Sequence, residues 1–330
     1  MRSGNFDRRR LGRRPPVGAP LLVLLVTIKL SLRQAFATKA ASGILAMRRY
    51  DPKRDYIMTR SGSSQDDNKL PPTRAFAWYG LAVILVASYV NSYENWRWLN
   101  ASIGSSSANV APFIITATAL AVAFSIARHG REWPSPAFVL GAAIALGALF
   151  LTNPDFPAKR IHVPQYMLLS LVLRRALFHG AIPESALTGL SVAMAVLFGI
   201  HDEFLQGFHP DRNFGLRDIG VNTLGALSGG LLASGFGLFV NGKAKAAQTG
   251  ISFAVTIIAM TAATLLLVAP MKAYRGQTIP PSTFMPLLAA CCVWALLPAR
   301  RPYALPWHIA GLLAISLILY PLASHAIRFY

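Results

Sequence analysis

The chain has 330 residues, of which 54% are hydrophobic and only 14% are charged, with a formal net charge of +19 and a mean hydropathy of +0.44. A soluble domain carries about 25% charged residues, so this balance excludes an ordinary soluble domain and predicts an integral membrane protein. The positive charge gathers in the first 74 residues and in short loops between apolar runs. This placement favours contact with anionic phospholipid near the N-terminus and argues against nucleic acid as a partner.

Residues 1–74 form a basic segment that we expect to be disordered or not native. Its apolar run, residues 17–32, is either an additional helix or the centre of a secretory signal that ends at the small residues 35–37. Translation from Met47 or Met58 is a further alternative. The sequence leaves these alternatives open.

Apolar runs long enough to cross a bilayer follow one another over the rest of the chain. At a rise of 1.5 Å per residue, an 18-residue helix covers about 27 Å, which matches the hydrocarbon core of a membrane. The predicted spans are residues 75–92, 109–127, 136–151, 165–179, 183–200, 219–240, 251–271, 284–297 and 307–324. The predicted fold is therefore an all-α, polytopic transmembrane helical bundle with about nine spans.

The predicted spans fall into three groups. Residues 75–135 hold two N-terminal transmembrane helices, residues 136–240 a four-helix core, and residues 241–330 three C-terminal transmembrane helices. Lys and Arg in the short loops divide eight to seven between the two sides, so the basic N-terminal segment decides the orientation. A cytoplasmic N-terminus places the loops 159–162 and 201–218 together on the extracytoplasmic side.

The densest polar stretch of the chain lies in the middle of the four-helix core. Asp202, Glu203 and Gln206 fall within about one helical turn at the end of a predicted span. Gly207 then ends that helix, and the following loop carries Arg212. Ionisable groups are expensive to place at a membrane, so they usually mark a functional site.

The next helix continues the polar pattern with Asp218, Asn222, Gly225 and Gly229, whose spacing puts all of them on one face. Asp218 lies in the first turn, where a carboxylate accepts backbone N–H groups and is favoured by the helix dipole. Gly225 and Gly229 form a GxxxG motif for close helix packing, and Asn222 is expected to hydrogen-bond across that interface.

A second polar cluster, with Lys159, Arg160, His162 and Tyr166, opens an earlier helix. The predicted orientation puts it at the same membrane face as the Arg212 loop. Short loops between the core helices favour a compact bundle, at whose outer end the two clusters would meet. The alternative is a purely structural charge network that locks helices together without binding a ligand.

Metal binding and nucleophilic hydrolysis fit these residues less well. The metal-ligand residue types near the site are His162, His201, Asp202, Glu203 and His209. They show neither HExxH nor paired-histidine spacing, so no metal and no cofactor is expected. A hydrolase needs Ser or Cys beside His201, whereas Ser228 falls inside a helix. Cys291 and Cys292 lack metal-site spacing and are expected to be small buried side chains.

The combined pattern resembles the VanZ-like family of membrane proteins. The family motif is Asp-Glu-x-x-Gln, a loop with Pro and Arg, then Asp-x-x-x-Asn-x-x-Gly-x-x-x-Gly, preceded by a helix that opens with a basic residue, His and Tyr. The matching residues are Arg160, His162, Tyr166, Asp202, Glu203, Gln206, Pro210, Arg212, Asp218, Asn222, Gly225 and Gly229. Asp211 stands where the family has Gly. The resemblance covers residues 136–240, about a third of the chain.

The resemblance implies a multi-pass protein of the cell inner membrane with a role in the cell envelope, and the family is associated with resistance to teicoplanin-type glycopeptides. We expect the site to bind the polar or anionic head group of a membrane lipid or lipid-linked envelope precursor. Arg212 and His162 would contact the anion, while Glu203, Gln206 and Asp218 would orient Arg212 and bind hydroxyls. The oligomeric state is left open.

Two alternatives use the same residues. In the first, the chain is an enzyme that modifies a lipid-linked saccharide or phospholipid, with Glu203 or Asp202 as general base and His201 or His162 as general acid. In the second, it is a transporter, which predicts broken helices or an internal repeat near the membrane midplane. The sequence shows no clear repeat, so the transporter ranks last, and binding without turnover is kept as the leading expectation.

Overall fold

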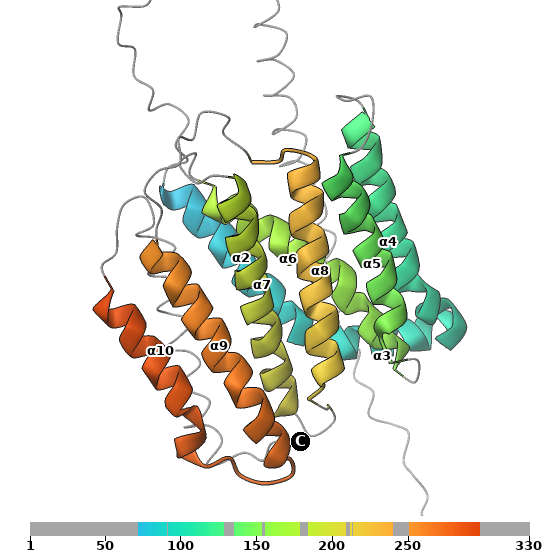
Figure 1. Cartoon of the computed structure of the whole chain (residues 1–330). Helices are drawn as coiled ribbons and strands as arrows, with labels where there is room; N and C mark the ends of the chain where they lie inside the picture. The colour runs from blue at the N-terminus through green and yellow to red at the C-terminus, as the bar shows by residue number, and fades with distance from the viewer. Residues whose placement is uncertain are drawn as a thin grey trace, which may run out of the picture. The chain divides into compact units, whose positions relative to one another are not determined.

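The computed structural model describes residues 72–90, 92–128, 135–153, 156–178, 184–208, 212, 214–239 and 251–297. In these ranges every regular element is a helix and no strand occurs, which confirms the all-α prediction for this part of the chain (Figure 1). The elements are α2 (Pro72–Val90), α3 (Ser92–Ile103), α4 (Ser105–Arg128), α5 (Pro136–Leu151), η1 (Pro157–Ile161), α6 (His162–Leu177), α7 (Glu184–Gly207), α8 (Leu216–Gly235), α9 (Ile251–Ala273), η2 (Pro281–Phe284) and α10 (Met285–Leu296).

Each predicted span from 75–92 to 284–297 overlaps an α-helix, whereas the predicted span 307–324 lies outside the described residues. Within the described ranges, the helices long and apolar enough to cross a membrane are Ser105–Ser125 in α4, Ala186–Gly207 in α7 and Ala254–Ala273 in α9. The pair α2 and α3 adds a fourth if it is counted as one bent span. Such helices are typical of an integral membrane protein.

The structure adds a helix, α3, that the sequence pattern does not predict. It follows α2 after a bend of 57°. Whereas α2 is apolar, α3 carries the exposed ion pair of Glu94 with Arg97 and an exposed Trp98. Charged and aromatic side chains of this kind favour the membrane surface over the hydrocarbon core. The first predicted span therefore ends at a helix break.

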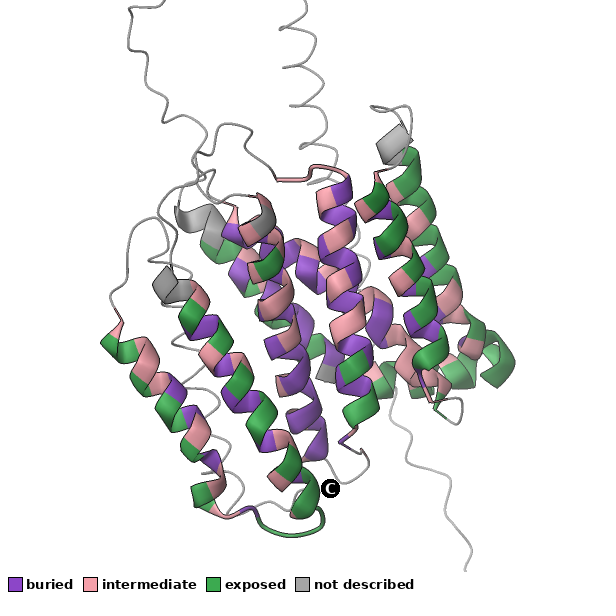
Figure 2. Cartoon of the chain, viewed as in Figure 1, coloured by how far each residue is buried: buried purple, intermediate pink, exposed green. Residues whose placement is uncertain are grey.

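The helices α6 and α8 are not among the long apolar helices, and both carry charged side chains. They lie in the middle of the described bundle, where α8 packs against α5, α6 and α7, and α2 packs against α6. Figure 2 shows α7 and α8 buried over most of their length, whereas α4, α9 and α10 keep exposed faces. The polar groups of α6 and α8 are therefore sheltered by neighbouring helices.

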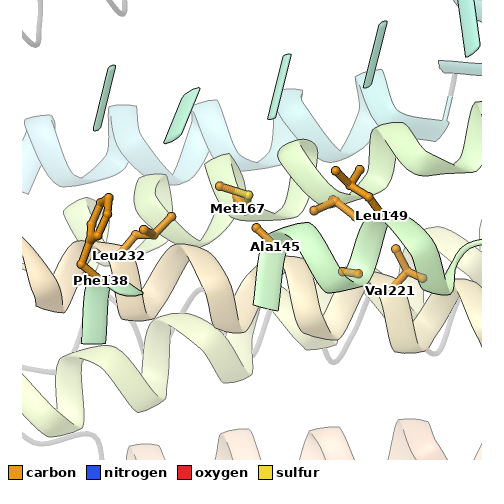
Figure 3. Packing of buried hydrophobic residues seen from close by; sticks show 8 residues of the cluster. Phe138, Ala145, Leu149, Met167, Val221 and Leu232 are labelled. Carbon is orange, nitrogen blue, oxygen red and sulfur yellow. The ribbon is translucent and has the colours of Figure 1, made fainter. Parts of the chain in front are cut away.

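The core between α5, α6 and α8 consists of apolar side chains that interlock along the three helices. Figure 3 shows this cluster, whose buried members are Phe138, Ala145, Ala148, Leu149, Val163, Met167, Val221 and Leu232. Ser135 starts α5 by accepting a hydrogen bond of 3.3 Å from the Phe138 N–H, and Pro136 fits the first turn. The core fixes how α6 and α8 lie against each other.

Small residues on α8 let its neighbours approach closely. Gly225 and Gly229 lie directly against the α6 backbone, and a Cβ at Gly229 would lie only 2.9 Å from Met167 Cα. This is the approach that GxxxG spacing favours. On another face of α8, Ser228 Oγ donates a hydrogen bond of 2.7 Å to Gly141 O of α5. Ser228 thus has a packing role.

The expectation that Cys291 and Cys292 are both buried is wrong. Cys292 is exposed and Cys291 is partly exposed in the described structure, and neither forms a disulfide bond there. Both lie on α10, which packs mainly against α9 and η2, so its other faces are not covered by the described residues.

Candidate functional site

Asp202 lies where α6 begins and α7 ends. It is fully buried, and its Oδ2 accepts a hydrogen bond of 2.9 Å from Tyr166 Oη. His162 Nδ1 lies 4.0 Å from the same oxygen. His162 and Tyr166 are one turn apart on α6, with ring centroids 6.2 Å apart, so one face of α6 presents both side chains to α7. The structure therefore brings the two sequence clusters together.

Glu203 and Asp218 connect the end of α7 to the start of α8. The backbone N–H of Gly215, the N-cap of α8, donates a hydrogen bond of 3.2 Å to Glu203 Oε2. Lys159 Nζ forms an ion pair with Asp218 Oδ2, which is almost fully buried. Asp218 thus binds a lysine from another element, and the preceding helix supplies the carboxylate that accepts the N-cap N–H.

Arg212 lies in the loop between α7 and α8 and is partly buried, with its Cζ atom 5.8 Å from the centre of the Tyr93 ring of α3. Burial lowers the pKa of Arg212, while the carboxylates of Asp202, Glu203 and Asp218 raise it. The guanidinium therefore lies close enough to all three carboxylates to interact with their charges. The orienting role expected for Glu203 and Asp218 is compatible with this position.

His162 is an uncharged member of the site. Burial, together with the positive charges of Arg212 and Lys159, lowers its pKa to about 3. The imidazole is therefore neutral at pH 7, and one of its ring nitrogens carries a hydrogen while the other accepts. A neutral imidazole contacts hydroxyl groups as readily as it contacts an anion.

Asn222 lies one turn deeper on α8 than Asp218. Its Nδ2 donates a hydrogen bond of 3.3 Å to Gly199 O. The interhelical hydrogen bond expected of Asn222 therefore runs to α7, whereas the GxxxG face packs on α6. Gly199 makes the contact possible, because a Cβ there would lie 3.0 Å from Asn222 Cβ and 3.1 Å from Tyr166 Cε1.

These residues form one group, the polar cluster, which consists of Lys159, His162, Tyr166, Asp202, Glu203, Gln206, Arg212, Asp218 and Asn222. Buried atoms of the cluster that have no hydrogen-bond partner within the described residues are His162 Nδ1, Asp202 Oδ1, Glu203 Oε1, Gln206 Nε2 and Asn222 Oδ1. Each buried polar atom left unmatched costs about 1–3 kcal/mol, and such atoms are rare in folded proteins. The polar cluster therefore has unmatched hydrogen-bonding atoms that a polar group could bind.

The sequence pattern puts Lys159 in the second polar cluster but assigns it no role, and it does not single out Tyr89 or Tyr93. Tyr89 Oη donates a hydrogen bond of 2.8 Å to Gln165 O, and its ring lies 5.6 Å from the Tyr166 ring. The available signal is the run of aromatic residues at the end of the first predicted span, which marks a membrane surface. The predicted orientation puts that surface on the side of the polar cluster.

The remaining predicted site residues lie at the edge of the polar cluster or beyond the description. His201 is partly buried on α7, immediately before Asp202. Arg160 lies on η1, with its Cζ atom 5.2 Å from the centre of the Phe113 ring of α4. His209 falls outside the described residues. Among the side chains that are described, no set of three or more His, Cys, Asp or Glu is arranged to hold a metal ion.

A second buried charge lies at the opposite end of α6. Arg174 is fully buried, its Nε donates a hydrogen bond of 3.0 Å to Leu238 O, and its Nη1 donates to Thr188 Oγ1 and Ser234 Oγ. Its Nη2 lies 3.6 Å from Glu184 Oε1. Arg174, Glu184, Thr188 and Ser234 form the Arg174 cluster, which joins α6, α7 and α8.

No protein-family model, curated protein sequence or solved structure matches the chain significantly. The function therefore has to be inferred from the chain's own residues. The polar cluster offers carboxylates, a neutral imidazole, amides and a guanidinium at one end of a helical bundle. These groups are suited to hydrogen bonding with a polar ligand and to proton transfer.

Proposed function

We propose that the chain is a VanZ-like protein of the cell envelope, located in the inner membrane, that binds the polar head group of a lipid or lipid-linked envelope precursor. The observation that carries the proposal is the set of buried polar atoms without a partner, which includes Glu203 Oε1 and Gln206 Nε2. Residue spacing from Arg160 to Gly229 supports the family assignment. A contribution to resistance against teicoplanin-type glycopeptides is part of the same proposal.

Arg212 is the residue through which a head group would enter the polar cluster. It belongs to the loop between α7 and α8, it is only partly buried, and it lies near the carboxylates of α7 and α8. A guanidinium in this position donates hydrogen bonds in a fixed planar geometry. The buried carboxylates and amides behind it would then contact the rest of the head group.

The test is to purify the full chain in mild detergent and identify the lipids that remain bound, by mass spectrometry, for the wild type and Arg212→Ala. We expect the wild type to retain a specific lipid and Arg212→Ala to retain about tenfold less, as the loss of a charged hydrogen bond predicts. Arg217→Ala is the matched control, because Arg217 is exposed in the first turn of α8.

Two results contradict the proposal. If Arg212→Ala folds and keeps the same lipid, Arg212 does not contact a head group. If Arg212→Ala fails to insert while Arg217→Ala inserts normally, the charges around Arg212 serve folding. Neither variant changes a helix interior, so both outcomes can be interpreted.

An enzyme that modifies the bound lipid is the second candidate, and one contact favours it. His162 Nδ1 lies 4.0 Å from Asp202 Oδ2, and Tyr166 donates to the same carboxylate. A carboxylate between an imidazole and a phenol is suited to general acid–base catalysis. Incubating the purified chain with lipid-linked saccharides and analysing the products tests this candidate, and no turnover with any of them excludes it.

A further inference from the structure

The unmatched atoms of the polar cluster include both hydrogen-bond acceptors and a hydrogen-bond donor. Glu203 Oε1, Asp202 Oδ1 and Asn222 Oδ1 are acceptors, whereas Gln206 Nε2 is a donor. All four side chains are 0–1% exposed. A ligand that satisfies them has to donate hydrogen bonds and also accept one.

Contacts within the protein determine which atom of Asp202, Glu203 and Asn222 has no hydrogen-bond partner. Asp202 Oδ2 accepts from Tyr166, and Glu203 Oε2 accepts from the Gly215 N–H. Asn222 uses its Nδ2 to bind Gly199 O, so its Oδ1 is the remaining atom. The unmatched acceptors are therefore a property of the packed helices and do not depend on a free choice of side-chain orientation.

The pair Asp202 and Gln206 offers one acceptor and one donor to a hydroxyl group. The two residues are four apart on α7 and their side chains interact, yet neither Asp202 Oδ1 nor Gln206 Nε2 has a partner with the full geometry of a hydrogen bond within the described residues. A hydroxyl next to both would accept from the amide and donate to the carboxylate. Neither a phosphodiester, which only accepts at pH 7, nor an ammonium group, which only donates, can do both.

Charge also disfavours an anion at this position. The three carboxylates of the cluster, Asp202, Glu203 and Asp218, face the cations Lys159 and Arg212, and Lys159 is already paired with Asp218. A phosphate beside these acidic side chains would add a further negative charge to a buried site, which is unfavourable. A neutral group with several hydroxyls meets the same atoms without this repulsion.

We propose that the group bound in the polar cluster is the neutral sugar of a glycosylated lipid, whose hydroxyls donate to Glu203 Oε1 and Asp202 Oδ1 and accept from Gln206 Nε2. The inference rests on the proposed function and narrows the head group from polar or anionic to a neutral saccharide. Hydrogen bonds from hydroxyls to carboxylates are charge-assisted and roughly twice as strong as neutral ones.

The experiment is a native mass spectrometry titration of the purified full chain with lipids of identical acyl chains. The probes are glucosyl diacylglycerol, the same lipid with its sugar hydroxyls O-methylated, phosphatidic acid and phosphatidylethanolamine. We expect glucosyl diacylglycerol to bind at least about tenfold more tightly than the other three, since a methylated sugar accepts hydrogen bonds but cannot donate them. The wild-type chain is used throughout, so folding does not differ between the arms.

A variant of Glu203 then tests whether its side chain contacts the sugar. Glu203→Gln exchanges the free acceptor for an amide, and we expect it to bind glucosyl diacylglycerol about tenfold more weakly. Glu184→Gln, on the same helix but in the Arg174 cluster, is the matched control and should bind like the wild type. Gel filtration and thermal unfolding of both variants establish that they are folded. If Glu203→Gln is folded and binds like the wild type, the contact assigned to Glu203 is wrong.

The outcomes separate this inference from the proposed function. Preferential binding of phosphatidic acid or phosphatidylethanolamine overturns the saccharide assignment and leaves lipid binding intact. Equal binding of the methylated and unmethylated glucosyl lipids also overturns the assignment, because hydroxyl donation is then not used. If none of the four lipids binds, the saccharide assignment is wrong, and the lipids that co-purify with the wild type decide separately whether the proposed function holds.

Discussion

The two ends of α6 bury charge in different ways. In the Arg174 cluster, a single guanidinium donates hydrogen bonds to a carbonyl and two hydroxyls, and its one nitrogen left unmatched in the described structure, Nη2, lies 3.6 Å from the Glu184 carboxylate, so each nitrogen faces a protein acceptor. In the polar cluster, carboxylates and amides are buried to the same degree, yet one atom of Asp202, Glu203 and Gln206 is left without a partner.

This difference separates a structural network from a candidate binding site. A buried charge whose nitrogens all face protein acceptors holds helices together and has little hydrogen-bonding capacity left for a ligand. A buried group with unmatched atoms pays a desolvation cost that a ligand or water can remove. Burial and charge alone would assign the same role to both clusters. They differ because, among the described residues, the one unmatched atom of Arg174 faces the Glu184 carboxylate, whereas the polar cluster has an unmatched atom on each of five side chains.

The largest loss of stability is expected at the Arg174 cluster. Arg174→Met keeps most of the side-chain volume but leaves Glu184 and the Leu238 carbonyl without their partner. We expect a loss of stability of about 3–5 kcal/mol, measured by thermal or denaturant unfolding in detergent. Lipid binding by the folded fraction should not change. Weaker lipid binding in that fraction would show that the Arg174 cluster belongs to the site.

A larger side chain between α6 and α8 tests whether the Arg174 cluster and the polar cluster are coupled. Gly229→Ala brings a Cβ against the Met167 backbone, and we expect up to about 3 kcal/mol of destabilisation from this overpacking. Because α6 also carries His162 and Tyr166, lipid binding should weaken as well. Gly220→Ala is the matched control on α8, since a Cβ there meets nothing within 4 Å. Equal stabilities of the two variants would contradict the close packing of α6 on α8.

The pH dependence of stability should come from the polar cluster and involve His162. Its pKa is lowered to about 3 in the folded chain, whereas the unfolded chain takes up the proton near the ordinary value of 6.5. The unfolded state therefore binds more protons below pH 6.5, and the stability contributed by neutral His162 is lost as pH falls. At pH 5 the loss is about 2 kcal/mol.

The measurement is the difference in stability between the wild type and His162→Gln at pH 7.5 and at pH 5. Taking this difference separates His162 from the other ionisable groups, which are the same in both proteins. The cations that face His162 are Arg212 and Lys159, and they are also unchanged in the variant. If the difference is the same at both pH values, His162 does not stay neutral in the folded chain.

The smallest loss of stability is expected at an exposed ion pair, which provides the reference for the clusters at both ends of α6. Arg97 Nη1 lies 3.5 Å from Glu94 Oε1 on α3, and both side chains are more than 60% exposed. Exposed pairs contribute about 0–1 kcal/mol, so Arg97→Met should leave the unfolding midpoint nearly unchanged. A loss comparable with that of Arg174→Met would mean that burial does not set the scale of these interactions.

Much of the local structure follows from the sequence alone. Apolar runs predict the α-helices from α2 to α10, with the exception of α3, because backbone groups in a membrane have to be paired within the helix. Gly207 ends α7 as its position predicts, since glycine tolerates the conformation that follows a helix. The spacing of Gly225 and Gly229 predicts a face for close packing, and those glycines do lie against α6.

The partners across the bundle were decided by the tertiary structure. Helical spacing states which residues share a face but not which helix that face meets, so Asn222 could be assigned an interhelical bond without its acceptor, Gly199 of α7. The pairing of Lys159 with Asp218 joins residues 59 positions apart, and no local pattern encodes it. The unmatched atoms of Asp202 and Glu203 emerge only after such pairings are known, because a vacancy in hydrogen bonding is a property of the packed bundle.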